Sequence, residues 1–241
     1  MTDPKTKGRV ETYLGDCREY MKRGTGTDAN FMLVDPPTAV LSDPKQRPLL
    51  EYILDHGPEN RAVIGFLGEM GTLYAKYGKP QLSLVWEPTD AQYGFGDVGP
   101  LYRSSYEIGV WSNYFYSELT RERSQEEWTQ KNVVLPGGRN PDRAKEKDVW
   151  RYPICTQGYN AKKKKHPNEK PLEMFVHLLE MVTCCGQTIF DPFMGSGSVG
   201  AACLDLFRRY IGIEIEGRWY KAAHKYLAEY ARVGRVFEGE E

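Results

Sequence analysis

The chain has 241 residues, of which 40% are hydrophobic and 27% are charged, and its formal net charge is −1. This composition is typical of a globular protein with one α/β domain and at most a small insertion. A net charge near zero excludes a global positive field for nucleic acid, although a local basic patch is compatible with it. We expect a cytosolic protein, because the polar N-terminus is no signal peptide and no apolar run approaches the roughly 20 residues of a membrane helix.

The cysteines and histidines give no sign of a metal site. Five cysteines are present, without a C-x-x-C pair and without a cluster of histidine and cysteine. An odd number of cysteines without metal-ligand spacing is typical of reduced thiols in the cytosol. The four histidines are scattered, and we assign none of them to chemistry. The sequence therefore predicts a protein without a metal cofactor.

Strand and helix patterns alternate through the first 111 residues. The expected strands are residues 9–14, 31–34, 62–67, 81–86 and 106–111. The expected helices are residues 17–23, 48–55 and 69–77. The segment 88–103 is rich in Gly, Tyr and Pro, and such a composition predicts a long loop.

The alternation stops at about residue 112 and resumes near residue 166. The intervening segment, 112–165, is polar and shows no clear period, so we expect a small irregular lobe there. The elements expected after it are a helix at 172–182, a strand at 188–190, a helix at 198–207, a strand at 210–215 and a helix at 218–231. Strands separated by helices predict a doubly wound, mostly parallel α/β sheet.

The segment IFDPFMGSGS (189–198) predicts a ligand site. It combines an apolar strand that ends in Asp191 with a glycine turn and a following helix. Gly195 and Gly197 have no side chain, so the backbone can approach a small ligand closely. The next expected strand ends in Glu214, and a carboxylate at that place can accept hydrogen bonds from both hydroxyls of a ribose. The order of these features indicates a nucleoside-binding β-α-β unit.

Two other nucleotide-binding patterns compete with this interpretation. The pattern G-x-x-x-x-G-K-[ST] is absent, which argues against a phosphate cradle. The dinucleotide pattern G-x-G-x-x-G is satisfied by Gly195, Gly197 and Gly200, although close helix packing is an alternative explanation of Gly200. Asp191 would repel a pyrophosphate but could hold an amino group, and it therefore favours a cofactor with an amino group.

At this point the chain resembles a known family, the amino-methylating DNA methyltransferases. DPFMGSGS (191–198) resembles their S-adenosylmethionine motif, and DPP (35–37) resembles their catalytic motif. The catalytic motif comes first, as in the circularly permuted β group of that family. Four further segments match family segments in order: LGDC (14–17), YEI (106–108), HPNEKPL (166–172) and GIEI (212–215). The resemblance covers most of the chain except roughly residues 112–150.

The resemblance implies a Rossmann-like fold with a seven-stranded sheet. It divides the chain into a catalytic half at 1–111, a small target-recognition lobe at 112–165 and a cofactor-binding half at 166–241. It also implies S-adenosylmethionine as the cofactor and double-stranded DNA as the partner. Whether the protein is a monomer or a homodimer stays open.

The resemblance assigns the cofactor residues. Asp191 is expected to bind the methionine ammonium, Glu214 the ribose, and Asp16 the adenine amino group. For Asp16 an N-cap of the following helix is an equal alternative, and one carboxylate can serve both purposes. The other expected cofactor residues are Lys170 and Pro171, through backbone and ring, with Phe193, Gly195, Ser196, Gly197 and Ser198.

Asp35, Pro36, Pro37 and Thr38 are the expected catalytic residues. The lone pair of an exocyclic amine is delocalised into the base, and two hydrogen-bond acceptors facing the NH₂ group would localise it. The Asp35 carboxylate and the Pro36 carbonyl can supply these acceptors, and the prolines stiffen the loop that holds them. Asp-Pro-Pro alone is a common turn, so this assignment depends on the neighbouring cofactor site.

Thr38 departs from the family pattern, which has Tyr, Phe or Trp at this place to stack on a base rotated out of the duplex. Another aromatic residue can substitute, with Tyr93 and Phe95 the nearest candidates. Alternatively the substrate is bound differently, as a single strand, or activity is weak or lost. Asp as the first letter of the motif favours adenine N6 over cytosine N4, with an RNA adenine and a non-catalytic cofactor- and DNA-binding protein as further alternatives.

The expected nucleic-acid contacts lie in or beside the small lobe. They are Lys162, Lys163, Lys164, Lys165, Arg139 and Arg143. Lysine contacts to phosphates would make binding strongly salt-dependent, although a solvated surface explains a lysine run equally well. A lobe of roughly 40–50 residues is small, and it predicts a short recognition site or loose specificity.

Overall fold

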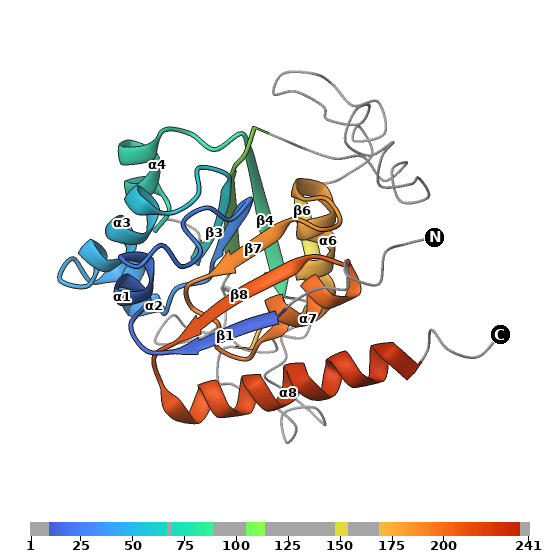
Figure 1. Ribbon diagram of the computed structural model, residues 1–241. Coiled ribbons are helices and arrows are strands. Elements are labelled where there is room, and N and C mark those ends of the chain that lie inside the picture. The colour runs from blue at the N-terminus through green and yellow to red at the C-terminus, as the bar shows by residue number, and fades with distance from the viewer. Residues whose placement is uncertain (1–9, 67–68, 89–104, 114–147, 154–168, 237–241) are drawn as a thin grey trace.

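The structure is a computed structural model, and it describes residues 10–66, 69–88, 105–113, 148–153 and 169–236. Within these residues the centre is an eight-stranded sheet of order β1-β8-β7-β2-β3-β5-β4-β6 (Figure 1). The strands are β1 (Val10–Leu14), β2 (Phe31–Val34), β3 (Arg61–Phe66), β4 (Leu82–Pro88), β5 (Tyr106–Trp111), β6 (Val149–Tyr152), β7 (Thr188–Asp191) and β8 (Arg209–Glu214). Among the described strands, only the β3–β5 and β5–β4 pairs are antiparallel.

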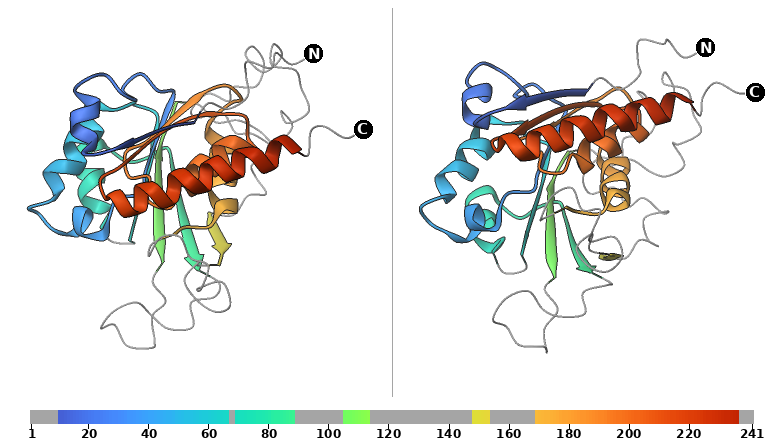
Figure 2. Two further views of the ribbon diagram at one scale, coloured as in Figure 1. Left: turned by 60° about the horizontal axis from the view of Figure 1, so that its bottom comes forward. Right: turned by 90° about the horizontal axis from the view of Figure 1, so that it is seen from below.

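Helices cover both faces of the sheet (Figures 1 and 2). One face carries α1 (Cys17–Met21), α2 (Thr38–Ser42), α3 (Arg47–His56) and α4 (Gly71–Tyr77). The other carries α6 (Leu172–Val182), α7 (Ser198–Asp205) and α8 (Gly217–Val236). None of the helices in the described ranges is long and apolar enough to span a bilayer.

The sequence of β2 explains the two layers of core. Its four residues, FMLV, are all buried, as expected for a central strand with helices on both sides. Side chains alternate across a strand, so Phe31 and Leu33 join one hydrophobic core and Met32 and Val34 join the other. The first core contains residues of α6, α7 and α8, and the second contains residues of α1 to α4.

The predicted fold class is confirmed, whereas the predicted number of strands is wrong. The sheet is doubly wound and mostly parallel, but it has eight strands in the described residues rather than seven. The additional strand, β6, lies inside the segment 112–165 that we expected to be irregular, and it pairs in parallel with β4. Four residues at a sheet edge, of which only Trp150 is buried, are too few to produce a period in the sequence. The short helix α2 was likewise not predicted.

The strand order brings the two predicted motifs together. β2 and β7 are parallel neighbours, with Met32 opposite Phe190. From β7 the chain continues through α7 to β8 on one side, while β2 is followed by β3 on the other side. Ligands of open α/β sheets bind at the carboxyl ends of the strands where the order reverses in this way. Asp191, at the end of β7, and Asp35, just after β2, both lie at this edge.

Candidate active site

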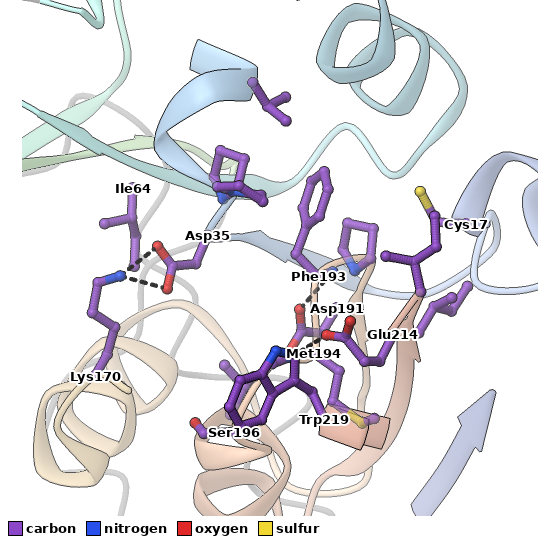
Figure 3. A pocket seen from close by; sticks show the side chains of 18 of the residues that line it. Cys17, Asp35, Ile64, Lys170, Asp191, Phe193, Met194, Ser196, Glu214 and Trp219 are labelled. Carbon is purple, nitrogen blue, oxygen red and sulfur yellow. Dashed lines mark hydrogen bonds and ion pairs between the residues drawn. The ribbon is translucent and has the colours of Figure 1, made fainter. Parts of the chain in front are cut away.

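A cavity of about 610 Å³ lies at this edge of the sheet (Figure 3). Its volume falls in the range of small-molecule sites, roughly 300–1,000 Å³. Both predicted centres line it, since Asp35 and Pro36 contribute to its wall together with Asp191 and Glu214. The main expectation from the sequence, that two stretches far apart in the chain meet at one cavity, is therefore confirmed.

The glycine turn after β7 is fixed against the end of β8. Gly195 has a φ of 53°, which favours glycine, and its N–H donates to Oε2 of Glu214 at 2.9 Å. Glu216 N–H donates to Oε1 of Glu214 at 2.8 Å. Each oxygen of Glu214 thus accepts one backbone hydrogen bond, and a carboxylate has further acceptor sites for a ligand hydroxyl. Glu214 lines the cavity while only 8% exposed.

Asp191 is the most deeply buried carboxyl group of the site. It is 1% exposed, Phe193 N–H donates to its Oδ1 at 3.1 Å, and the Tyr210 hydroxyl donates to its Oδ2 at 2.9 Å. Burial raises the pKa of Asp191 to about 7, although both hydrogen bonds act in the opposite direction. A cation in the cavity would favour the ionised carboxylate. The environment of Asp191 therefore suits the ammonium group that the resemblance assigns to it.

The three glycines of the G-x-G-x-x-G pattern have different structural roles. Gly195 lines the cavity, whereas Gly197, with a φ of 81°, begins α7 and is not among the cavity-lining residues. A Cβ on Gly197 would lie 3.3 Å from Leu227 of α8. A Cβ on Gly200 would lie 2.9 Å from Leu227 and from Tyr210. Close packing therefore explains Gly200, as the alternative interpretation of the sequence had it.

The remaining predicted cofactor residues lie at or beside the cavity. Phe193, Ser196 and Ser198 line it, and the two serine hydroxyls are 2.9 Å apart. Pro171 is buried at the N-cap of α6 and is not among the lining residues. Lys170 also lines the cavity. We expected its backbone to do so, and in addition its side chain donates a hydrogen bond to Asp35 there.

Asp16 is the N-cap of α1, which confirms one of its two predicted roles. Its Oδ1 accepts from Arg18 N–H at 2.9 Å, and Arg18 Nε donates to the same oxygen at 3.0 Å. The hydrogen bond from the Arg18 side chain lowers the pKa of Asp16. Asp16 also lines the cavity, so contact with an adenine amino group stays a prediction.

The two predicted hydrogen-bond acceptors for the target amine, the Asp35 carboxylate and the Pro36 carbonyl, differ in their hydrogen-bond partners. The Pro37 carbonyl accepts from Val40 N–H at 2.8 Å and so begins α2. The Pro36 carbonyl has no hydrogen-bond donor among the described residues, and Pro36 lines the cavity. Asp35 is paired with Lys170, whose Nζ lies 3.0 Å from Oδ1 and 2.9 Å from Oδ2 (Figure 3). Within the described part of the chain, one acceptor thus has no donor and the other is shared with a lysine.

An aromatic stack that we did not predict lines the cavity. Tyr106 lies between two rings, with its centroid 4.7 Å from that of Phe66 and 4.6 Å from that of Trp86. All three residues and Thr38 line the cavity. Phe66 and Tyr106 are direct partners in the β3–β5 ladder, a non-local pairing that the sequence pattern does not reveal. Tyr93 and Phe95, the candidates from the sequence, lie outside the described residues.

The predicted nucleic-acid contacts are not part of the described structure. Lys162, Lys163, Lys164, Lys165, Arg139 and Arg143 all lie outside the described residues. Within the part of the chain that the structure describes, no group of three or more His, Cys, Asp or Glu side chains is arranged to hold a metal ion.

The fold and the site define a doubly wound α/β protein with a carboxylate-lined cavity at the carboxyl edge of its sheet. Known structures share the fold. The M1.HpyAVI–SAM complex superposes with a TM-score of 0.60 at 18% identity, covering 90% of this chain and 98% of that one. The PvuII DNA methyltransferase superposes with a TM-score of 0.63 at 11% identity, covering 97% and 94%.

Sequence comparisons identify the family. The DNA methylase family model N6_N4_Mtase matches residues 69–225, and the chain therefore belongs to this family. The type II methyltransferase M2.MboI of Moraxella bovis is 36% identical over 96 residues, which is 37% of this chain and 35% of that protein. The putative methylase YubD of Escherichia coli K12 is 28% identical over 227 residues, which is 90% of each chain. Asp35 precedes the residues matched by the family model.

Proposed function

We propose that this chain transfers a methyl group from S-adenosylmethionine to the exocyclic amine of a DNA base, with adenine N6 preferred over cytosine N4. The observation that carries this proposal is the shared cavity. It joins the Asp35 carboxylate and the Pro36 carbonyl to the Asp191 and Glu214 carboxylates. Membership of the DNA methylase family supports the same reaction class.

The residues of the cavity fit S-adenosylmethionine. Asp191 offers a buried carboxylate for an ammonium group, and Glu214 offers a carboxylate for hydroxyl groups. Gly195 leaves room beside the turn, and Phe193, Ile215 and Trp219 provide apolar lining for a purine ring. When bound, the cofactor supplies an electrophilic methyl group on a sulfonium. The cavity thus offers both carboxylates and apolar side chains that complement the polar and apolar parts of this cofactor.

Asp35 and Pro36 are the residues that act on the amine. Two acceptors in fixed positions align the NH₂ hydrogens, so that the nitrogen lone pair points out of the plane of the base. The prolines restrict φ, and α2 begins directly behind them, so these acceptors sit on a rigid loop. A metal ion is not needed for this step, because a sulfonium is a good leaving group.

The preference for adenine rests on Asp as the first residue of the Asp-Pro-Pro motif. The fold does not distinguish adenine from cytosine as the target base, since the structurally similar PvuII enzyme is described as cytosine-N4-specific. Thr38 favours a second candidate function, a protein that binds cofactor and DNA but transfers methyl groups poorly. The stack of Phe66, Tyr106 and Trp86 argues for retained transfer, because it brings aromatic rings to the cavity that Thr38 also lines.

Incubation with methyl-labelled cofactor and unmethylated DNA, followed by digestion to nucleosides, tests the proposal. Label in N6-methyladenine supports it, and label in N4-methylcytosine supports the reaction but corrects the base. Cofactor binding without transfer to double-stranded DNA, single-stranded DNA or RNA would refute it. Asp35→Ala is the matched control, expected to bind S-adenosylhomocysteine like the wild type while transferring no methyl group.

A further inference from the structure

The ion pair between Lys170 and Asp35 has a geometry that the family resemblance did not assign. Lys170 precedes α6 and Asp35 follows β2, so the pair connects two segments far apart in the chain at the wall of the cavity. The lysine nitrogen lies 3.0 Å from Oδ1 and 2.9 Å from Oδ2, and it therefore contacts both oxygens rather than one. The Lys170 side chain is 10% exposed and that of Asp35 is 18% exposed.

Lys170 is held on two further sides. Its ammonium lies 5.4 Å from the centroid of the Tyr106 ring, a distance at which a cation and an aromatic face attract. Tyr106 is itself fixed between the rings of Phe66 and Trp86. Pro171 follows Lys170 and restricts its backbone to extended conformations immediately before α6. The ammonium therefore has little freedom to leave the carboxylate.

From this arrangement we infer that Lys170 is a positioning residue for the methyl transfer proposed above: it fixes the Asp35 carboxylate in the orientation that receives the target amine. A carboxylate has about four acceptor sites, so a lysine that occupies one site on each oxygen leaves others for the amine hydrogens. This inference rests on the proposed function, and it gives Lys170 a role in catalysis rather than in cofactor binding.

The kinetic test compares Lys170→Met, which removes the charge at similar size, with Lys170→Arg, which keeps it. We expect Lys170→Met to lower kcat at least about tenfold, because small misplacements of reacting groups are costly. The KM for DNA and the Kd for S-adenosylhomocysteine should stay within about twofold, and Lys170→Arg should recover part of kcat. Lys76→Met is the control: Lys76 also pairs with carboxylates, of Glu51 and Asp55, but lies away from the cavity.

A kcat of Lys170→Met within about twofold of the wild type would overturn the inference. So would a loss of kcat that accompanies an equal loss of cofactor affinity, since that result places Lys170 on the cofactor. A loss of kcat that Lys170→Arg does not recover at all also counts against it.

A second measurement separates this inference from the proposed function. Thermal unfolding of Asp35→Asn, Lys170→Met and the double variant forms a double-mutant cycle that needs no turnover. We expect the double variant to unfold no lower than the less stable single variant, because the second change removes a partner already lost. Additive shifts would mean that the pair does not form, whatever the wild type methylates. Absence of transfer by the wild type, with a non-additive cycle, would instead reject the proposed function, and the catalytic role of Lys170 with it.

Discussion

The Tyr210 hydroxyl donates a 2.9 Å hydrogen bond to Asp191. The two residues lie on the adjacent strands β8 and β7, and both side chains are buried. Space for the phenol ring comes from Gly212, where a Cβ would lie 2.5 Å from the Tyr210 oxygen. Asp191 accepts a backbone hydrogen bond on its other oxygen, from Phe193. Asp191, the proposed partner of the cofactor ammonium, is therefore oriented from behind by a residue that does not line the cavity.

Tyr210→Phe should destabilise the protein, because it leaves Oδ2 of Asp191 buried without its donor. We expect a loss of roughly 1–3 kcal/mol in the free energy of unfolding, measured by urea denaturation. The same variant should bind S-adenosylhomocysteine more weakly, since the carboxylate is no longer held in one orientation.

Tyr230→Phe is the matched control for this change. The Tyr230 hydroxyl also donates to a carboxylate, that of Asp205 at 2.8 Å, but this pair is on the exposed surface of α8 and α7. Its loss should cost less than about 1 kcal/mol, because water replaces the missing partner. Equal losses for the two variants would contradict the importance of burial at Asp191.

The raised pKa of Asp191 predicts a pH dependence of stability. In the unfolded chain the pKa returns to its ordinary value of 3.8, whereas burial raises it to about 7 in the folded protein. Between these two pKa values the folded state binds more protons than the unfolded state. The free energy of unfolding therefore falls as pH rises through this range, and the unfavourable contribution of Asp191 is complete above about pH 7.

Asp191→Asn removes this titration. Relative to the wild type, the variant should gain at least about 1 kcal/mol of stability between pH 5 and pH 8, since each pKa unit corresponds to about 1.4 kcal/mol. Comparing the two pH values cancels the pH-independent cost of the altered hydrogen bonds. The difference is measured by urea denaturation at both pH values. A constant difference across this range would show that Asp191 does not titrate there.

The local patterns in the sequence predicted most of the core. β2, β5 and α6 lie where the apolar patterns placed them, and the other core elements differ from the expected ranges by a few residues at their ends. The two motifs also met as expected, because carboxyl ends of adjacent parallel strands share one edge of the sheet.

Features that depend on non-local contacts were not predictable in the same way. β6 forms a strand by pairing with β4, because its own four residues are too few to show an alternation of apolar and polar side chains. The pairing of Lys170 with Asp35 depends on how α6 approaches β2, which no spacing in the sequence encodes. The stack around Tyr106 likewise required the antiparallel pairing of β3 with β5.

Thr38 and Phe66 provide a test of base stacking. If the Phe66–Tyr106–Trp86 stack replaces the missing ring, Phe66→Ala should weaken binding of the target base by about 1–3 kcal/mol, seen as a higher KM for DNA. Thr38→Tyr should then give little gain in turnover. A large gain from Thr38→Tyr, with no effect of Phe66→Ala, would show that the wild type lacks a stacking surface.

Asp16 allows its structural and binding roles to be separated. Serine is also a favourable N-cap, so Asp16→Ser should retain the stability of α1, whereas Asp16→Ala should lose about 1 kcal/mol of unfolding free energy. If the Asp16 carboxylate also accepts from the adenine amino group, both variants should bind S-adenosylhomocysteine several-fold more weakly, because neither side chain extends as far into the cavity. Calorimetric titration measures the affinity, and thermal unfolding of the free proteins measures the cap. Wild-type affinity in Asp16→Ser would leave Asp16 with the capping role alone, and the adenine would then need another acceptor at the cavity wall.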